Sequence, residues 1–292
     1  MQSREEATAI RPLSGQEFEQ FRNLAYKTFG LDLKEGKEQL VSSRLGKLIA
    51  GLNFRSFHDY YDHVVADKTG DALLAMVDAL TTNHTSFLRE PAHLEFLCQQ
   101  LLPDLAKRNR VRLWCAASST GEEPYTLAFS MLEALPAGSR AQVEIIASDI
   151  STRVLEIAQR AVYTADRLQG VSPALQSKYF LRGEGRSQGF YKVKPQVRKL
   201  VEFCRVNLVE PYPDMAPFPV IFCRNVMIYF DKPTQERVVN RLAHYLEPGG
   251  HLFIGHSESL MGADQPLEYV RPAVYRKPGP GSASSLRKTV RA

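Results

Sequence analysis

The chain has 292 residues, of which 44% are hydrophobic and 24% are charged, and its formal net charge is +5. This composition excludes an intrinsically disordered protein, and no apolar run reaches the ~18 residues of a membrane-spanning helix. The first eleven residues lack the apolar core of a secretory signal, and the four cysteines show no metal-binding spacing. We therefore expect a cytoplasmic protein with reduced thiols and no bound metal.

Residues 14–82 place apolar side chains at helical spacing and contain few strand signals. We predict that they form a small all-helical domain, preceded by a disordered stretch over residues 1–13. The second predicted helix carries three basic residues that can share one face: Lys37, Arg44 and Lys47. This face is either an ordinary solvated surface or a docking site for an acidic helix.

From residue 83 onwards, short apolar runs alternate with helical patterns. Strands are expected at residues 111–117, 143–147, 219–223 and 251–255, and helices at residues 121–135, 152–160 and 233–246, the last closed by Pro248-Gly249-Gly250. This alternation predicts an α/β fold with a doubly wound parallel sheet over residues 83–277. Residues 267–270 and 273–276 are expected to add an antiparallel hairpin at its edge, and the Pro-Gly-Ser-rich residues 278–292 to form a disordered tail.

Two β-prone runs, at residues 178–182 and 190–194, interrupt the alternation. They flank a loop that contains Gly183, Gly185 and Gly189, so we predict a β-hairpin with a third strand near residues 199–204. The resulting antiparallel insert, at about residues 178–204, would have a free edge, and free edges can bind extended peptides.

Polar residues follow the predicted strands, where ligands bind in sheets of this kind. The turn before the helix at 121–135 contains one glycine, unlike the glycine-rich turns that bind phosphate. Glu122 and Glu123 either stabilise the start of this helix through its dipole, or repel a pyrophosphate and favour a ligand with a positive amino group. Asp149 ends the second strand and is either a ribose acceptor or the N-cap of the next helix. A cofactor with a ribose, a positive amino-acid portion and no phosphate is S-adenosylmethionine.

Five short motifs, in this order along the chain, make residues 14–277 resemble the CheR-type methyltransferases of bacterial chemotaxis. They are TTNHTSFLRE at residues 81–90, STGEEPY at 119–125, ASD at 147–149, FCRNVMIYF at 222–230 and GHSES at 255–259. The resemblance implies an enzyme that transfers a methyl group from S-adenosylmethionine to glutamate side-chain carboxylates of chemotaxis receptors, in sensory adaptation. It further implies a cytoplasmic monomer that is recruited to membrane receptors.

The resemblance also implies roles for individual residues. Arg89 and Tyr229 are expected nearest the transferred methyl group. The expected cofactor contacts are Asn83, Thr85, Arg89, Glu123, Asp149, Asn207, Leu208, Asn225 and Val226. The basic residues Lys37, Arg44 and Lys47 would dock the receptor. A receptor C-terminal tail would bind Gly183, Gly185, Gly189 and Arg198, although a hairpin that only packs on the sheet is an equal alternative.

A glutamate carboxylate is already ionised at pH 7, so its methylation requires alignment of the reactants more than a general base. Arg89 is expected to position that carboxylate through a bidentate pair.

Two other classes of protein remain as alternatives to a receptor methyltransferase. The positive net charge would suit a methyltransferase that acts on RNA or DNA, but the chain lacks a set of aromatic and basic strand residues for base stacking. The second is a cofactor-binding adaptor without activity, and the presence of both Arg89 and Asn225 argues against it.

Overall fold

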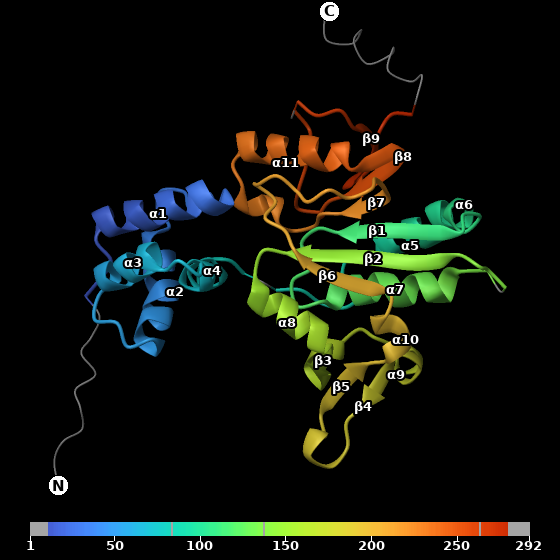
Figure 1. Ribbon diagram of the computed structural model, residues 1–292, viewed down its shortest axis with the longest axis horizontal. Coiled ribbons are helices and arrows are strands. Elements are labelled where there is room, and N and C mark those ends of the chain that lie inside the picture. The colour runs from blue at the N-terminus through green and yellow to red at the C-terminus, as the bar shows by residue number, and fades with distance from the viewer. Residues whose placement is uncertain (1–10, 83, 137, 263, 280–292) are drawn as a thin grey trace, which may run out of the picture. The chain divides into compact units, whose positions relative to one another are not determined.

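The computed structural model describes residues 11–82, 84–136, 138–262 and 264–279, and it divides the chain into two compact units (Figure 1). The first, here called the helical unit, holds the chain up to residue 83 together with Tyr229–Asp231. The second, the sheet unit, holds His84–Ile228 and the residues from Lys232 onwards. Within the described ranges, no helix has both the length and the apolar character needed to span a bilayer.

The helical unit contains α1 (Gly15–Phe29), α2 (Glu38–Gly51), α3 (Phe57–Ala66) and α4 (Asp71–Leu80), as the apolar spacing predicts. Ser14 starts α1 with a capping box, in which its hydroxyl accepts from the Glu17 amide and the Glu17 carboxylate accepts from the Ser14 amide at 2.8 Å. Gly30 ends α1 in the left-handed conformation, at φ 68°. Fully buried side chains at helical spacing form the core of this unit: Phe21, Ala25, Val41, Leu45, Ile49, Tyr60 and Met76.

A short segment distant in the sequence completes the helical unit. The Tyr229 carbonyl accepts from the Asp32 amide at 2.8 Å, and Phe230 forms an antiparallel bridge with Leu31. The Tyr26 hydroxyl donates to the Asp231 carboxylate at 2.8 Å. These contacts place Tyr229 in the helical unit, whereas the residues up to Ile228 and from Lys232 belong to the sheet unit.

The sheet unit contains a sheet with strand order β6-β2-β1-β7-β8-β10-β9. The strands are β1 (Arg110–Cys115), β2 (Gln142–Asp149), β6 (Val201–Arg205), β7 (Phe218–Phe222), β8 (Leu246–Phe253), β9 (Glu268–Arg271) and β10 (Val274–Arg276). The first five of these run parallel, and β10 is antiparallel to both β8 and β9. The predicted doubly wound sheet is confirmed. The predicted terminal hairpin also forms, with β10 beside β8 and β9 at the outer edge.

Helices connect and cover these strands. They are α5 (Pro91–Phe96), the π-helical turn η1 (Leu97–Leu101), α6 (Leu102–Leu105), α7 (Glu122–Ala134), α8 (Thr152–Arg160), the 3₁₀ turn η4 (Met227–Tyr229) and α11 (Lys232–His244). Helices α7 and α8 pack on β2 and β6, and α11 packs on β8. Trp114 of β1 is fully buried in this packing, and its indole N–H donates to the Ser148 hydroxyl at 2.9 Å, which satisfies the polar group of an otherwise apolar core residue.

Pro248-Gly249-Gly250 lie inside β8, contrary to the prediction that they close the preceding helix. Helix α11 already ends at His244. The strand tolerates this turn-like sequence because its pairing with β7 shifts register between Phe218 and Val220, and Gly249 adopts φ 80° there.

The insert differs from the prediction in its third strand. The small sheet has the order β3-β5-β4, formed by β3 (Val162–Thr164), β4 (Phe180–Arg182) and β5 (Phe190–Val193). Residues 201–205 instead form β6, which pairs with β2 in the main sheet, with Val201 opposite Ile145. A run of strand-forming residues suits either sheet, so only this long-range pairing decides its place.

Short helical elements join the small sheet to the main one. They are η2 (Ala165–Leu168), α9 (Pro173–Tyr179), η3 (Gly185–Ser187) and α10 (Pro195–Arg198). Figure 1 shows the small sheet beyond α8 and α10, on the side of the sheet unit where β6 lies. The insert therefore starts near residue 162 and ends before β6.

The order of the strands defines where a ligand would bind. The chain runs from β1 outward to β2 and β6, and then crosses back to β7 and β8 on the other side of β1. Ligands of doubly wound sheets bind at such a switch point, beyond the carboxyl ends of the strands. In this protein that edge holds the segments that follow Cys115, Asp149, Phe222 and Phe253.

Candidate functional site

Backbone strain concentrates at the carboxyl edge of the sheet. Seven non-glycine residues in the described parts of the chain have positive φ, and four of them belong to segments at this edge: Leu88, Glu90, Ser119 and Asn225. Their φ angles lie between 46° and 59°. Conformations of this kind cost of order 1–3 kcal/mol each and cluster at functional sites. The strain marks this edge as the candidate site.

Arg224, which directly follows the buried strand β7, connects the segments of the site. Its side chain is only 2% exposed. Nη1 donates to Glu123 at 2.8 Å, Nη2 donates to the Arg89 carbonyl at 2.8 Å, and Nε donates to Glu90 at 3.2 Å. Burial by itself would lower the pKa of Arg224, but Glu123 and Glu90 outweigh it and raise that pKa. Arg224 therefore joins the first turn of α7 to the segment at residues 84–90.

Arg224 lies within the motif at residues 222–230, but the sequence alone indicates no structural role for it. A signal was present, because a lone Arg at the end of the apolar run Phe218–Cys223 must find a partner if it is buried. The identity of those partners, 101 and 134 residues away, has no local signature.

Glu258 is a second residue that sequence reasoning missed. Its carboxylate accepts backbone N–H groups from Gly255 at 2.5 Å, Asn225 at 2.9 Å, Met227 at 2.7 Å and Ile228 at 3.2 Å. Burial raises the pKa of Glu258 although these donors favour its ionised form. The contacts fix the loop after β7 to the loop after β8, and they hold Asn225 in its strained conformation.

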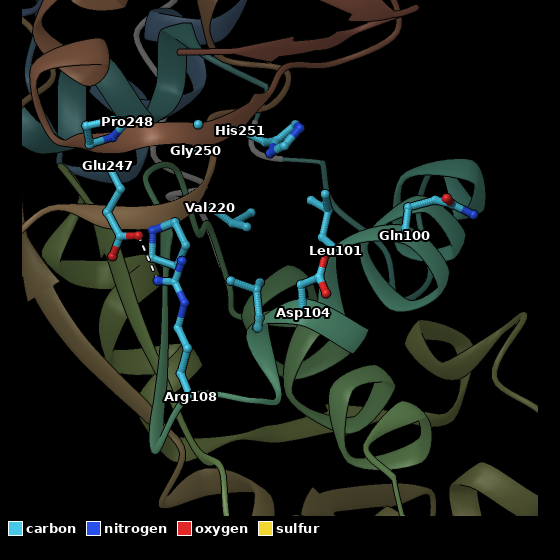
Figure 2. Close-up of a pocket in the computed structure, with 12 residues that line it drawn as sticks. Gln100, Leu101, Asp104, Arg108, Val220, Glu247, Pro248, Gly250 and His251 are labelled. Carbon is cyan, nitrogen blue, oxygen red and sulfur yellow. Dashed lines mark hydrogen bonds and ion pairs between the residues drawn. The ribbon is translucent and has the colours of Figure 1, made fainter. Parts of the chain in front are cut away.

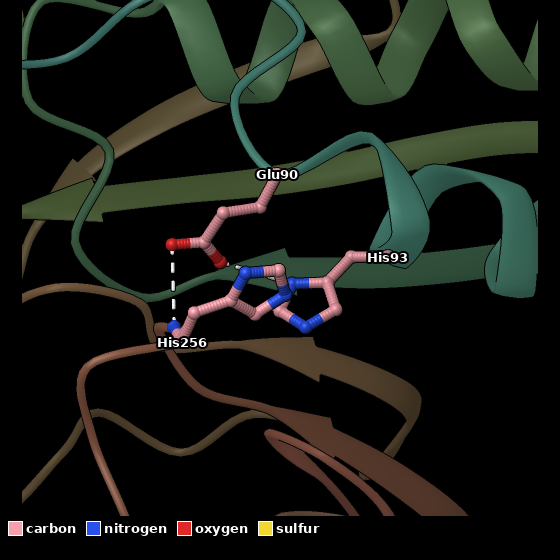
Figure 3. Close-up of side chains that lie close together, drawn as sticks. All are labelled: Glu90, His93 and His256. Atoms are coloured by element: carbon pink, nitrogen blue, oxygen red, sulfur yellow. Dashed lines mark hydrogen bonds and ion pairs between the residues drawn. The ribbon is translucent and has the colours of Figure 1, made fainter.

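Glu90 lies beside two histidines, as Figure 3 shows. Its carboxylate accepts from the His256 amide at 3.2 Å and lies 3.3 Å from Nδ1 of the buried His93. Burial, followed by the nearby Arg224, lowers the pKa of His93 to about 4, so His93 is neutral at pH 7. Burial disfavours ionisation of Glu90, but Arg224 together with hydrogen bonds from the His256 amide and the Asn225 side chain outweighs it, and the pKa of Glu90 is lowered. Arg224, 3.0 Å from the carboxylate, is thus the cation that balances Glu90.

Asp149 ends β2 at the site and is held by backbone groups. Its carboxylate accepts from the Ser119 amide at 2.8 Å and from the Ser151 amide at 3.1 Å. The N-cap of α8 is Ser151, whose hydroxyl accepts from the Val154 amide. Of the two alternatives for Asp149, the structure therefore assigns the cap to Ser151, and it leaves the half-buried carboxylate at the carboxyl edge.

The two glutamates that begin α7 have different surroundings, and each has a protein partner. Glu122 is fully buried and forms an ion pair with Arg167, so it faces protein rather than a ligand. Glu123 accepts from Arg224, and also from the Cys115 thiol at 3.3 Å. The expectation that both glutamates select a cationic ligand is wrong for Glu122, because a buried carboxylate requires a partner of its own.

Arg89 is the basic residue of the site that remains available. Its guanidinium donates to the His84 carbonyl at 3.1 Å. Among the residues that the structure describes, no carboxylate pairs with the Arg89 side chain. It is half-buried and lies next in sequence to the Glu90–Arg224 pair. An arginine in this state can receive a carboxylate from a second molecule.

Other predicted cofactor contacts occupy the same unit. Thr85 is buried, and Val226 is half-buried. Asn207 follows β6, and its side-chain oxygen accepts from the Val209 amide at 3.2 Å. The carbonyl of the buried Leu208 accepts from the Tyr212 hydroxyl at 3.1 Å and is also bound by Arg241. Asn83 lies outside the described residues.

Three predicted residues have structural partners of their own. The Tyr229 hydroxyl donates to the Thr82 carbonyl at 2.9 Å, within the helical unit. Arg44 donates to the Leu80 carbonyl and, at 2.7 Å, to the Thr82 hydroxyl, so it supports the end of α4. Arg198 donates to the Gln159 carbonyl at 3.1 Å, at the last turn of α8, and thus lies away from the hairpin loop.

A cavity of about 190 Å³ lies at the opposite edge of the sheet. It is lined by residues of β7 and β8, including Val220, Gly250 and His251, and by the ion pair between Arg108 and Glu247 at 2.7 Å (Figure 2). None of the predicted site residues lines it. The strained and charged residues thus lie at the carboxyl edge, where ligands of such sheets bind.

Comparison with known proteins agrees with this geometry. The CheR methyltransferase SAM-binding domain matches residues 83–275, and the CheR methyltransferase all-alpha domain matches residues 16–81. The chain is 41% identical to chemotaxis protein methyltransferase 2 of Pseudomonas aeruginosa, over 89% of this chain and 92% of that one.

Two further relatives have similar coverage. A probable chemotaxis protein methyltransferase of Rhizobium etli is 40% identical, over 82% of this chain and 91% of that protein. The chemotaxis protein methyltransferase of Borreliella burgdorferi is 36% identical, over 87% and 91% respectively. With two matching family domains and relatives along nearly its whole length, the chain belongs to the CheR family of S-adenosylmethionine-dependent methyltransferases.

Proposed function

We propose that this methyltransferase esterifies glutamate side chains of chemotaxis receptors. The observation that carries the proposal is Arg89, a guanidinium at the site without a carboxylate partner among the described residues. An acceptor carboxylate would supply that partner. The printed names of the relatives, chemotaxis protein methyltransferases, support a receptor as its source.

The reaction requires little proton chemistry from the protein. S-adenosylmethionine, when bound, supplies a methyl group on a sulfonium leaving group, and the acceptor carboxylate is already ionised at neutral pH. The residues of this chain would therefore orient the carboxylate through Arg89 and exclude water. Orientation of this kind can contribute about 7–11 kcal/mol to lowering the barrier. The surroundings of His93 agree, since its imidazole is fully buried and its pKa of about 4 makes it a weak proton acceptor.

The test of this function is transfer of a labelled methyl group to the cytoplasmic fragment of a receptor. Glutamate methyl esters release methanol in alkali, whereas N-methyl groups on nucleic-acid bases do not. The matched control is the same fragment with glutamines in place of the modified glutamates. Label that enters RNA or DNA and resists alkali would support the alternative substrate class, and no transfer to any acceptor would support the adaptor.

We assign the cofactor to the carboxyl edge of the sheet unit. The edge has carboxylates and polar backbone groups but no glycine-rich phosphate cradle, which suits a nucleoside without phosphate. Asp149 would accept from the ribose hydroxyls, and Glu123 would lie near the amino-acid portion. The remaining proposed contacts are Asn83, Thr85, Arg89, Asn207, Leu208, Asn225 and Val226.

Asp149→Ala is expected to weaken binding of S-adenosylhomocysteine by about 1.5–3 kcal/mol, because it removes charged hydrogen-bond acceptors. Asp149→Asn keeps one acceptor oxygen, so its affinity should lie between those of the unaltered protein and Asp149→Ala. The exposed Glu156 of α8 offers a control, and Glu156→Ala should bind like the unaltered protein. Calorimetric titration measures all four proteins. Unchanged affinity in Asp149→Ala would remove this residue from the cofactor site.

We further propose that the basic residues near α2 dock an acidic receptor helix. Lys47 lies on α2 and Lys37 is its N-cap, and both are exposed. Arg44 donates to Leu80 and Thr82, so we expect it to contribute to docking by stabilising the fold of the helical unit. Replacing both lysines with glutamine should raise the Michaelis constant for the receptor and weaken its salt dependence. Methylation that is insensitive to ionic strength in the unaltered enzyme would contradict electrostatic docking.

The small sheet is a candidate site for a receptor tail. Its outer strand β4 ends in the loop with Gly183, Gly185 and Gly189, and a peptide added to such an edge gains main-chain hydrogen bonds. Such tethering would recruit the enzyme from the cytoplasm to membrane receptors and raise its effective concentration there. A monomeric enzyme would be sufficient for this tethering. Titration with receptor C-terminal peptides tests this, with Arg198→Ala expected to bind the peptide more weakly than the unaltered protein. A failure of every such tail to bind would leave the insert without this role.

A further inference from the structure

The base of the small sheet contacts the turn between β1 and α7. Tyr163 of β3 is only 4% exposed, and its hydroxyl donates to the Thr120 carbonyl at 2.8 Å. Thr120 lies one residue after the strained Ser119, whose amide donates to Asp149. The same turn is thus held by β2 on one side and by the insert on the other.

Arg167, in the turn that follows β3, makes a second set of contacts. Its Nε donates to Glu122 at 2.9 Å, and its Nη2 donates to the Thr120 hydroxyl at 2.9 Å. That hydroxyl in turn donates to the other oxygen of Glu122 at 2.6 Å. Because Glu122 is fully buried, the ion pair with Arg167 fixes the first residue of α7 and the turn before it.

The packing of Gly121 shows how closely the turn approaches the insert. Gly121 has φ 97°, and a Cβ added to it would lie 2.7 Å from the Tyr163 hydroxyl oxygen and 2.9 Å from Cβ of Ala158. Both the backbone conformation and the space therefore require glycine. The turn therefore packs directly against the insert, and the hydrogen bonds from Tyr163 and Arg167 oppose movement away from it.

We propose that Tyr163 and Arg167 are positioning residues for S-adenosylmethionine, which they serve by holding the turn at residues 118–122 in its binding conformation. The inference rests on the proposed placement of the cofactor at the carboxyl edge. It makes the base of the small sheet part of the cofactor site, whether or not the outer strand binds a receptor tail. Neither residue contacts the reacting atoms, so their effect is on cofactor binding rather than on methyl transfer.

The test uses Tyr163→Phe in the full chain, since this change removes one hydroxyl and keeps the buried ring. The Kd of S-adenosylhomocysteine should rise about 5–20-fold, as expected for one lost hydrogen bond in a buried site. The KM for S-adenosylmethionine should rise by a similar factor, and kcat at saturating cofactor should stay within twofold. Arg167→Lys keeps the charge but loses the planar fork, and it should show the same split between KM and kcat.

Tyr191 provides a matched control, because it pairs with Tyr163 across the small sheet and its hydroxyl makes no hydrogen bond to other described residues. Tyr191→Phe should bind the cofactor like the unaltered protein, and urea unfolding should give similar midpoints for Tyr163→Phe and Tyr191→Phe. Normal affinity in both Tyr163→Phe and Arg167→Lys would overturn the inference, as would a fall in kcat without a change in KM. If the unaltered protein fails to bind S-adenosylhomocysteine, the cofactor assignment itself is wrong and the inference fails with it.

Discussion

Replacing Arg224 with methionine should abolish detectable cofactor binding and lower the free energy of unfolding of the sheet unit by about 3–5 kcal/mol. Methionine has a similar length and fills the space, but it leaves two carboxylates, Glu90 and Glu123, without their cation in a buried site. The Arg89 carbonyl would lose its donor as well. Because Arg224 joins segments that are distant along the chain, this change should disturb the site as a whole.

Urea unfolding and calorimetric titration separate the two effects of Arg224→Met. The exposed Arg186, in the hairpin loop, provides a control, and Arg186→Met should change neither quantity. Arg224→Lys should be intermediate, since an ammonium group supplies charge but cannot reach three acceptors in one plane. A stable Arg224→Met protein that binds the cofactor normally would show that the carboxylates find other partners, contrary to the role inferred for Arg224.

Replacing Arg89 with alanine should lower kcat at least about 100-fold while changing the affinity for S-adenosylhomocysteine by less than about threefold. The reason is positional, because misplacement of a reacting group by about 1 Å costs a factor of this size. The fold should tolerate the change, since the guanidinium donates to one carbonyl, that of His84. The Arg89 backbone, which accepts from Arg224, stays in place.

Steady-state methylation of a receptor fragment, together with calorimetry, distinguishes the possible roles of Arg89. The exposed Arg153 of α8 is a suitable control, and Arg153→Ala should retain full activity. If cofactor affinity falls in parallel with the rate, Arg89 is chiefly a cofactor contact. Full activity in Arg89→Ala would exclude it from both roles.

The pattern of apolar residues alone was sufficient to predict the class of fold. Helix α8 matches its predicted range, residues 152–160, and the ends of β1, β2 and β7 lie within one or two residues of theirs. Such elements are readable because the spacing of buried side chains along one segment reflects its own local geometry. The cofactor class could also be inferred, since a single glycine in the turn at residues 118–123 excludes a phosphate cradle.

What the sequence could not determine is which distant groups meet. Strand β6 has the same composition whether it joins the insert or pairs with β2, and only its register with Ile145 decides. Glu122 and Glu123 are adjacent and chemically identical, yet one is paired with Arg167 and the other with Arg224. Arg44 and Arg198 were expected at binding surfaces, and no local pattern indicates the distant carbonyl groups to which they donate.

The physical reason is that burial and charge pairing are properties of the packed chain. The local pattern predicts that an arginine follows a strand. Only the tertiary structure shows that Arg224 is buried and that Glu90 and Glu123 balance its charge. The same holds for Glu258, which collects four backbone donors from two loops. The sequence by itself determined the alternation of strands and helices, the cofactor class and the family. The tertiary structure decided which charged residues hold the site together and which, like Arg89, remain available to a substrate.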